Sequence, residues 1–180
     1  MSNTQTSPEM RALRAEERLV AELSNLGIGY LSRRSVTRPA PARAPSRLLA
    51  DMVCQPSSRV RTALIALLLA HPEYAVHVPA ALRRLPPEPA QTLKFFYTAA
   101  VILQRQYQSE LQPLLGSSWL PLPHLFADEF PLPTDPGQQL QALARLHQER
   151  TGQRLNWAGT YEHAARNLLR RWQMEKLWNR

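Results

Sequence analysis

The residues of this chain that could carry out chemistry are few and far apart. The tightest group of possible metal ligands is His124 with Asp128 and Glu129. It lies in a proline-rich stretch, where a helical spacing cannot be relied on to bring side chains together. Ser117 and Ser118 have no histidine or carboxylate at a spacing typical of an activated nucleophile. The spacing therefore predicts no metal site and identifies no catalytic group.

Phosphate-binding glycine loops are also missing from the sequence. The six glycines occur singly and match neither the P-loop nor the dinucleotide-binding pattern. We therefore expect no cofactor. The sequence favours a protein that is not an enzyme, without excluding a site assembled from distant residues.

Basic side chains form the clearest pattern, and they gather at the two ends of the chain. Residues 137–180 hold eight Arg or Lys against three acids, and residues 27–50 hold five Arg against no acid. The stretch 51–136 is close to neutral, with six basic and seven acidic residues. A near-neutral middle with basic flanks is typical of proteins that bind nucleic acid or an acidic partner. A GC-rich genome would also favour arginine, so the position of the arginines is more informative than their number.

Two groups of arginines are the candidate contacts to a nucleic-acid backbone. The C-terminal segment has an apolar arc and an opposite basic face when it is drawn as a helix. Residues 33–47 contain three Pro, five Arg and no acid, which indicates an extended arm. Guanidinium groups bind phosphate oxygens in a bidentate manner. The candidate contacts are Arg166, Arg170 and Arg171 on the helix, and Arg33, Arg34, Arg38 and Arg43 in the arm.

The elements that must position these side chains are predicted to be helices. Ser7, Pro8 and Glu9 are typical of a helix start, and Gly27 is typical of a helix end. The sequence Gly27–Tyr30 could form a short strand. Two central segments are apolar on every side and must be surrounded by other elements. The predicted helices are 8–26, 63–70, 78–85, 88–111, 137–151 and a last helix that Asn156 caps.

The fold class that follows is all-α. We expect a compact bundle of about six helices with a Pro-rich extended strap and a basic N-terminal linker. Residues 1–47 would form the amphipathic helix and the linker, and residues 48–180 the helical core domain. A chain of this length buries roughly two-thirds of its unfolded surface and needs no disulfide. One cysteine, Cys54, excludes an internal disulfide and favours a reducing compartment, so we expect the cytoplasm.

The proline-rich segment Trp119–Pro133 has two interpretations. Its near-repeats could form a polyproline ligand for an aromatic groove on another protein. It could also be a strap of extended chain that packs its apolar side chains across the helices. The many large apolar residues favour the strap. The most apolar runs of the chain, 63–70 and 95–103, are too short to span a membrane, and no membrane contact is expected.

Two functional hypotheses remain. The first is a non-enzymatic helical subunit that contacts an RNA or DNA backbone through its basic ends, within a larger complex. The alternative is a protein-interaction module, or a neutralising partner of an enzyme, without nucleic-acid contact. It would use the strap or the N-terminal helix. The scarcity of exposed stacking aromatics, of which Trp178 is the one candidate, predicts backbone contact and not base recognition.

Overall fold

The computed structural model describes residues 7–31 and 42–178, and these residues form an all-helical fold without strands. Eight α-helices are joined by short connections and by three 3₁₀ helices, η1 (Gly29–Leu31), η2 (Pro72–His77) and η3 (Gly116–Ser118). The α-helices are α1 (Pro8–Asn25), α2 (Pro45–Val53), α3 (Ser58–Ala70), α4 (Val78–Leu82), α5 (Pro87–Gln106), α6 (Gln108–Leu115), α7 (Pro136–Thr151) and α8 (Trp157–Trp178).

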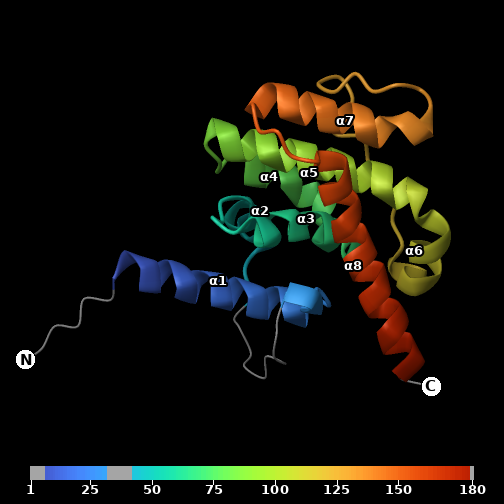
Figure 1. The fold of residues 1–180 in the computed structure, drawn as a ribbon. Coiled ribbons are helices and arrows are strands. Elements are labelled where there is room, and N and C mark those ends of the chain that lie inside the picture. Colours follow the sequence, from blue (N-terminus) through green and yellow to red (C-terminus); the bar gives the residue numbers. More distant parts are fainter. Residues whose placement is uncertain (1–6, 32–41, 179–180) are drawn as a thin grey trace, which may run out of the picture.

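The centre of the molecule is formed by α3 and α5, the two segments that the sequence predicts to be apolar on all sides. Every residue of α3 from Ala63 to Ala70 is buried, and so is the run Phe95–Gln104 of α5. Helix α3 packs against α5 and α8, and α5 packs against α7 (Figure 1). A helix that is covered on several sides cannot place charges in its middle turns without desolvating them. This explains why the central part of the sequence is nearly neutral.

Helix ends follow the residues that the sequence marks as caps. The Ser7 hydroxyl accepts a hydrogen bond from the Met10 amide, and Gly27 takes φ 83° after the end of α1. Gly152 takes φ 68° after α7. The side-chain oxygen of Asn156 accepts a hydrogen bond from the Gly159 amide at 3.0 Å. Local capping therefore fixes where α1, α7 and α8 meet their loops.

Two differences raise the number of helices from about six to eight. Helix α2, which begins at Pro45, was not predicted, because arginine and proline dominate the residues before it. Proline is well tolerated in the first turn of a helix, and Leu48, Leu49 and Met52 bury the inner face of α2. The predicted helix 88–111 is interrupted at Tyr107, whose φ of −103° and ψ of 20° separate α5 from α6.

Smaller elements also differ from the prediction. The possible strand at Gly27–Tyr30 is wrong, because the chain forms the 3₁₀ helix η1 there. The helix predicted for 78–85 ends at Leu82. Within the described ranges no single helix is long and apolar enough to cross a membrane. Helix α3 and the segment Pro72–Leu82 reach that length and composition only together, across a bend of 115°.

The segment between η3 and α7 contains no helix and is fastened to α5 by hydrogen bonds. Gln104, which is 3% exposed, donates to the Leu120 carbonyl and accepts from the Leu122 amide, both at 2.8 Å. The Tyr97 hydroxyl donates to the Pro123 carbonyl at 2.8 Å. The segment buries the side chains of Leu122, Phe126 and Phe130.

The two terminal helices extend past the central body. In Figure 1 the N-terminal half of α1 lies away from the other helices, and the last turns of α8 continue beyond them. The second half of α1 returns to the core through Leu19 and Leu23, which are at most 1% exposed. The exposed parts of these two helices are therefore the regions that folding alone does not cover.

Candidate interaction surface

The three predicted arginines of α8 are all exposed, and Arg166 and Arg170 lie one turn apart on the same side of the helix. Arg166 donates to Glu162 at 2.9 Å and, at 3.4 Å, to the Tyr107 hydroxyl. The hydrogen bond with the Tyr107 hydroxyl and the negative charge of Glu162 raise the pKa of Arg166 above its ordinary value. Arg171 donates to Glu175 at 2.6 Å, whereas Arg170 makes no ion pair with any residue that the structure describes. Two of the three guanidinium groups are thus already paired with carboxylates of the same helix.

Arg43, the fourth described candidate, has an internal role. Its amide and its guanidinium both donate to the buried carboxylate of Glu22, at 2.6 and 2.9 Å. Its Nε atom also lies 3.2 Å from Asp51. Arg43 thereby ties the start of α2 to α1. The other arm candidates, Arg33, Arg34 and Arg38, lie outside the described residues.

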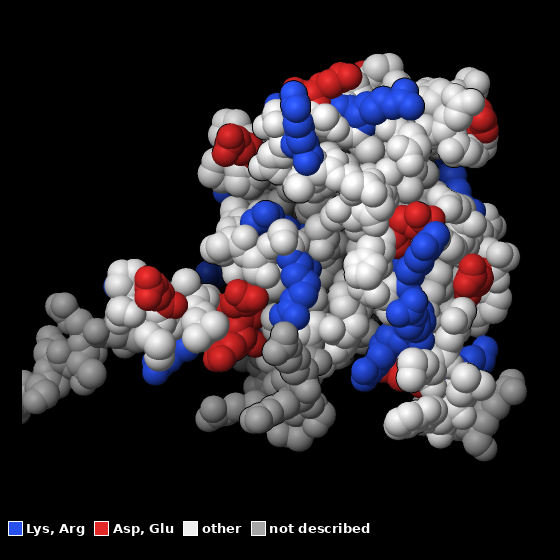
Figure 2. Space-filling model, viewed as in Figure 1, with Lys and Arg blue, Asp and Glu red and all other residues white. Residues whose placement is uncertain are grey.

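The surface charge of the described residues is mixed. They carry eighteen basic and fourteen acidic side chains. Figure 2 shows acidic side chains among the basic ones on the face that it displays, including the region around α8. Exposed pairs of this kind contribute little to stability and can exchange their partners. The arrangement therefore leaves phosphate contact possible for the α8 arginines but does not form a continuous basic surface.

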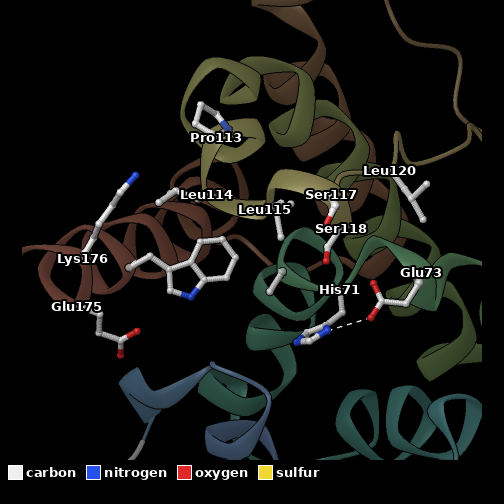
Figure 3. Close-up of a pocket in the computed structure, with 12 residues that line it drawn as sticks. His71, Glu73, Pro113, Leu114, Leu115, Ser117, Ser118, Leu120, Glu175 and Lys176 are labelled. Carbon is white, nitrogen blue, oxygen red and sulfur yellow. Dashed lines mark hydrogen bonds and ion pairs between the residues drawn. The ribbon is translucent and has the colours of Figure 1, made fainter. Parts of the chain in front are cut away.

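The structure also contains an open groove at the end of α8, which the sequence does not predict. An open groove of about 850 Å³ separates α6 and η3 from the end of α8, and we call it the α6–α8 groove. Figure 3 shows Pro113, Leu114 and Leu115 along one wall and Glu175 and Lys176 of α8 along another. The remaining lining residues are Ala70, His71, Glu73, Ser117, Ser118, Leu120 and Trp172.

The polar residues of the groove do not form a nucleophile site. His71 has its Nε2 atom 2.7 Å from the Leu26 carbonyl oxygen and its Nδ1 atom 3.0 Å from a Glu73 carboxylate oxygen. Both partners are hydrogen-bond acceptors, and neither ring nitrogen is hydrogen-bonded to Ser117 or Ser118. A serine nucleophile requires such a contact with its base. The described residues of the groove therefore show no serine–histidine pair.

The end of α8 next to the groove exposes large apolar side chains. Met174, Leu177 and Trp178 are 49%, 69% and 84% exposed. The spacing i, i+3, i+4 places them on one face of the helix, which we call the α8 ridge. A second cavity of about 250 Å³ lies along this end and is lined by Arg171, Met174, Glu175 and Trp178. Large apolar groups gathered on one exposed face are typical of interaction sites.

The histidine whose pKa is shifted most lies in the core. His147 is 1% exposed, and its ring stacks between Phe95 at 4.2 Å and Trp157 at 3.8 Å. Its Nδ1 atom shares a hydrogen bond with the Tyr161 hydroxyl at 2.5 Å. Burial lowers the pKa of His147 to about 4, and burial also raises the pKa of Tyr161. The sequence places His147 on the apolar face of its helix, but the spacing gives no sign of this aromatic stack.

His124, Asp128 and Glu129 do not form a site. Among the described residues no three potential metal ligands lie close enough to hold an ion. Glu129 instead binds Lys94 at 2.7 Å, and its carbonyl accepts a hydrogen bond from Arg150.

Comparison with known proteins adds no functional assignment. No family model, curated protein or solved structure matches this chain. The geometry of the surface therefore has to carry the functional argument.

Proposed function

We propose that this protein is a non-catalytic interaction module that binds a segment of protein in the α6–α8 groove. The observation that supports this most is the open α6–α8 groove, whose α6 wall leaves Leu114 and Leu115 partly exposed. Helical segments commonly bind in such grooves by inserting apolar side chains. Trp178 does not line the groove, but an exposed tryptophan at the end of the flanking helix is a residue type that contributes much binding energy at interfaces.

The strap, residues 119–133, contributes Leu120 to the groove lining and is otherwise packed on the core. Leu122, Phe126 and Phe130 are buried in this chain's own core. The side chains that anchor this strap are therefore not free for the aromatic groove of another protein, although Leu120 and Leu125 of the strap stay exposed. We therefore assign most of residues 119–133 to stability, and the Arg- and Pro-rich residues that precede α2 to a basic linker.

The groove can be tested with one substitution and one matched control. Leu115 is half-buried on the groove wall, so Leu115→Glu would place a charge where a ligand's apolar groups pack. Leu155, which is 53% exposed and lies outside the groove, provides the control Leu155→Glu. The tagged proteins would be recovered from the native source after nuclease digestion, and the bound proteins would be identified.

We expect a protein that is retained by the wild type and by Leu155→Glu, and lost with Leu115→Glu. Equal recovery with all three proteins would contradict docking in the groove. So would the absence of any protein bound after nuclease treatment, including a second copy of the chain.

Contact with a nucleic-acid backbone is the second candidate function. It is supported by the net charge of +8 and by the exposed positions of Arg166, Arg170 and Arg171 on α8. It predicts retention of a labelled oligonucleotide that falls steeply with salt. The double substitution Arg166→Ala with Arg170→Ala should weaken this retention. Salt-independent or undetectable retention at low ionic strength would remove this candidate.

A further inference from the structure

Two opposite faces of α8 are available near its end. Successive residues of an α-helix are about 100° apart. The α8 ridge (Met174, Leu177, Trp178) therefore lies on the side of the helix opposite to Trp172 and Lys176, which line the groove. Both faces of α8 therefore carry partly or fully exposed side chains that a partner could cover.

The wall of the groove opposite α8 carries apolar side chains, as the α8 ridge does. Leu114 and Leu115 of α6 are half-buried, and Leu120 is 49% exposed. Two turns of helix with a diameter of about 10 Å occupy roughly 800 Å³. The groove volume is about 850 Å³. The volume of the groove is therefore comparable with that of two helical turns, and its α6 wall presents leucine side chains.

We propose that the occupant of the groove is the end of α8 from a second copy of this chain. The proposal rests on the proposed docking function of the groove and names its ligand. In the resulting dimer, the α8 ridge of each copy packs against Leu114 and Leu115 of the other. The exchange is reciprocal, so a two-fold axis relates the copies and closes the assembly.

This arrangement covers both faces of α8 at once. A helix that lies between α6 and α8 of another copy turns one face to that α8 and its opposite face to that α6. The first face carries Trp172, Glu175 and Lys176, and the second face is the α8 ridge. A helix from an unrelated protein would fill the groove but would leave the ridge of this chain exposed.

The charges on the contacting faces are self-complementary. In an antiparallel pair of α8 helices whose axis passes between residues 175 and 176, Glu175 faces Lys176 of the second copy, and the reverse pair forms as well. Lys176 makes no ion pair with the described residues of its own chain, whereas Glu175 binds Arg171. The dimer therefore adds two oppositely charged pairs beside that existing bond. Complementary charges of this kind fix the register of an interface.

The charge pairs give a direct experiment on the full chain. The molar mass would be measured by light scattering and sedimentation from 1 to 100 µM (about the range over which weak dimers form). The wild type should approach twice the chain mass of 20.5 kDa. Lys176→Glu should weaken the dimer at least about tenfold, because Glu175 and the new carboxylate then repel each other twice. The double substitution Glu175→Lys with Lys176→Glu restores opposite charges and should restore the dimer.

Arg145→Glu is the matched control, since Arg145 is an exposed arginine on α7. It should leave the mass unchanged, and circular dichroism would verify that every variant is folded. A wild type that stays monomeric at 100 µM would overturn the proposal. So would a dimer that Lys176→Glu does not weaken, or one that the double substitution does not restore.

These outcomes also separate this proposal from the proposed function. A monomeric wild type that still binds a different protein, sensitive to Leu115→Glu, removes the second copy and leaves the docking function in place. A monomer that recovers no such protein removes both.

Discussion

The two halves of α8 differ in what surrounds the same kind of side chain. In the first half, Trp157 and Tyr161 are buried against α5 and α7 and stack with His147. In the second half, from Arg170 to Trp178, no residue is buried, although this part also carries tryptophan, leucine and methionine. The apolar residues of the first half are therefore part of the core, whereas the apolar residues of the second half do not contribute to it.

The position of the second half of α8 explains why its apolar residues stay exposed. Helix α8 packs against α3, α5 and α7 along its first turns and extends past them at its end (Figure 1). Apolar groups that the fold does not cover add nothing to the hydrophobic stabilisation of the single chain. They can contribute only when another surface removes them from water.

The largest expected contrast is between the two tryptophans. Trp157→Ala should lower the free energy of unfolding by about 3–5 kcal/mol, since it opens a cavity in the aromatic stack. Trp178→Ala should change it by less than about 0.5 kcal/mol in the monomer, because the side chain is exposed. Urea unfolding of both variants under dilute conditions provides the measurement. Similar losses for both variants would break the distinction between the two halves of the helix.

The second contrast depends on pH and on His147. Burial lowers the pKa of this residue to about 4, from an ordinary value near 6.5. Between these values the unfolded chain binds a proton that the folded chain excludes. The stability contributed by His147 is therefore complete above pH 6.5 and falls as the pH drops towards 4, by up to about 3 kcal/mol.

His147→Phe is the control for this dependence, because it keeps a ring between Phe95 and Trp157 that cannot be protonated. The decrease in unfolding free energy between pH 7 and pH 4 should be about 3 kcal/mol smaller in this variant than in the wild type. An equal decrease in both proteins would assign the acid sensitivity to carboxylates elsewhere.

The smallest effect concerns the exposed ion pair at the end of α8. Arg171 and Glu175 are four residues apart and half exposed, a geometry that contributes about 0.3–0.5 kcal/mol. Arg171→Ala should lower the free energy of unfolding of the monomer by no more than this. A loss above about 1 kcal/mol would mean that the end of α8 is held to the body more firmly than its exposure indicates.

Much of the fold could be predicted from the sequence, because it depends on local patterns. The all-round apolar runs correctly marked α3 and α5 as the centre, and capping residues marked the ends of α1, α7 and α8. Helix α2 was missed, since its short amphipathic pattern follows an arginine- and proline-rich stretch. The break at Tyr107 was also missed, and the hydroxyl of this residue contacts Glu162 and Arg166, which lie more than fifty residues away.

The candidate site was harder to predict, because it depends on packing. Charge drew attention to Arg166, Arg170 and Arg171. The i,i+4 spacing already indicates a pair between Glu162 and Arg166, which the structure confirms, and the structure adds a second pair between Arg171 and Glu175. The α6–α8 groove joins Leu114 with Lys176, two residues whose proximity no periodicity indicates. Trp178 and the basic residues of the C-terminal helix were the signals in the sequence that pointed to this end of the chain.

The most direct test of the account is amide hydrogen exchange along α8 at rising protein concentration. If the end of α8 enters the groove of a second copy, exchange of residues 170–178 should slow as the concentration rises. Exchange of residues 161–168, which are already packed in the core, should not change. Exchange at the end of α8 that stays equally fast at every concentration would contradict the account.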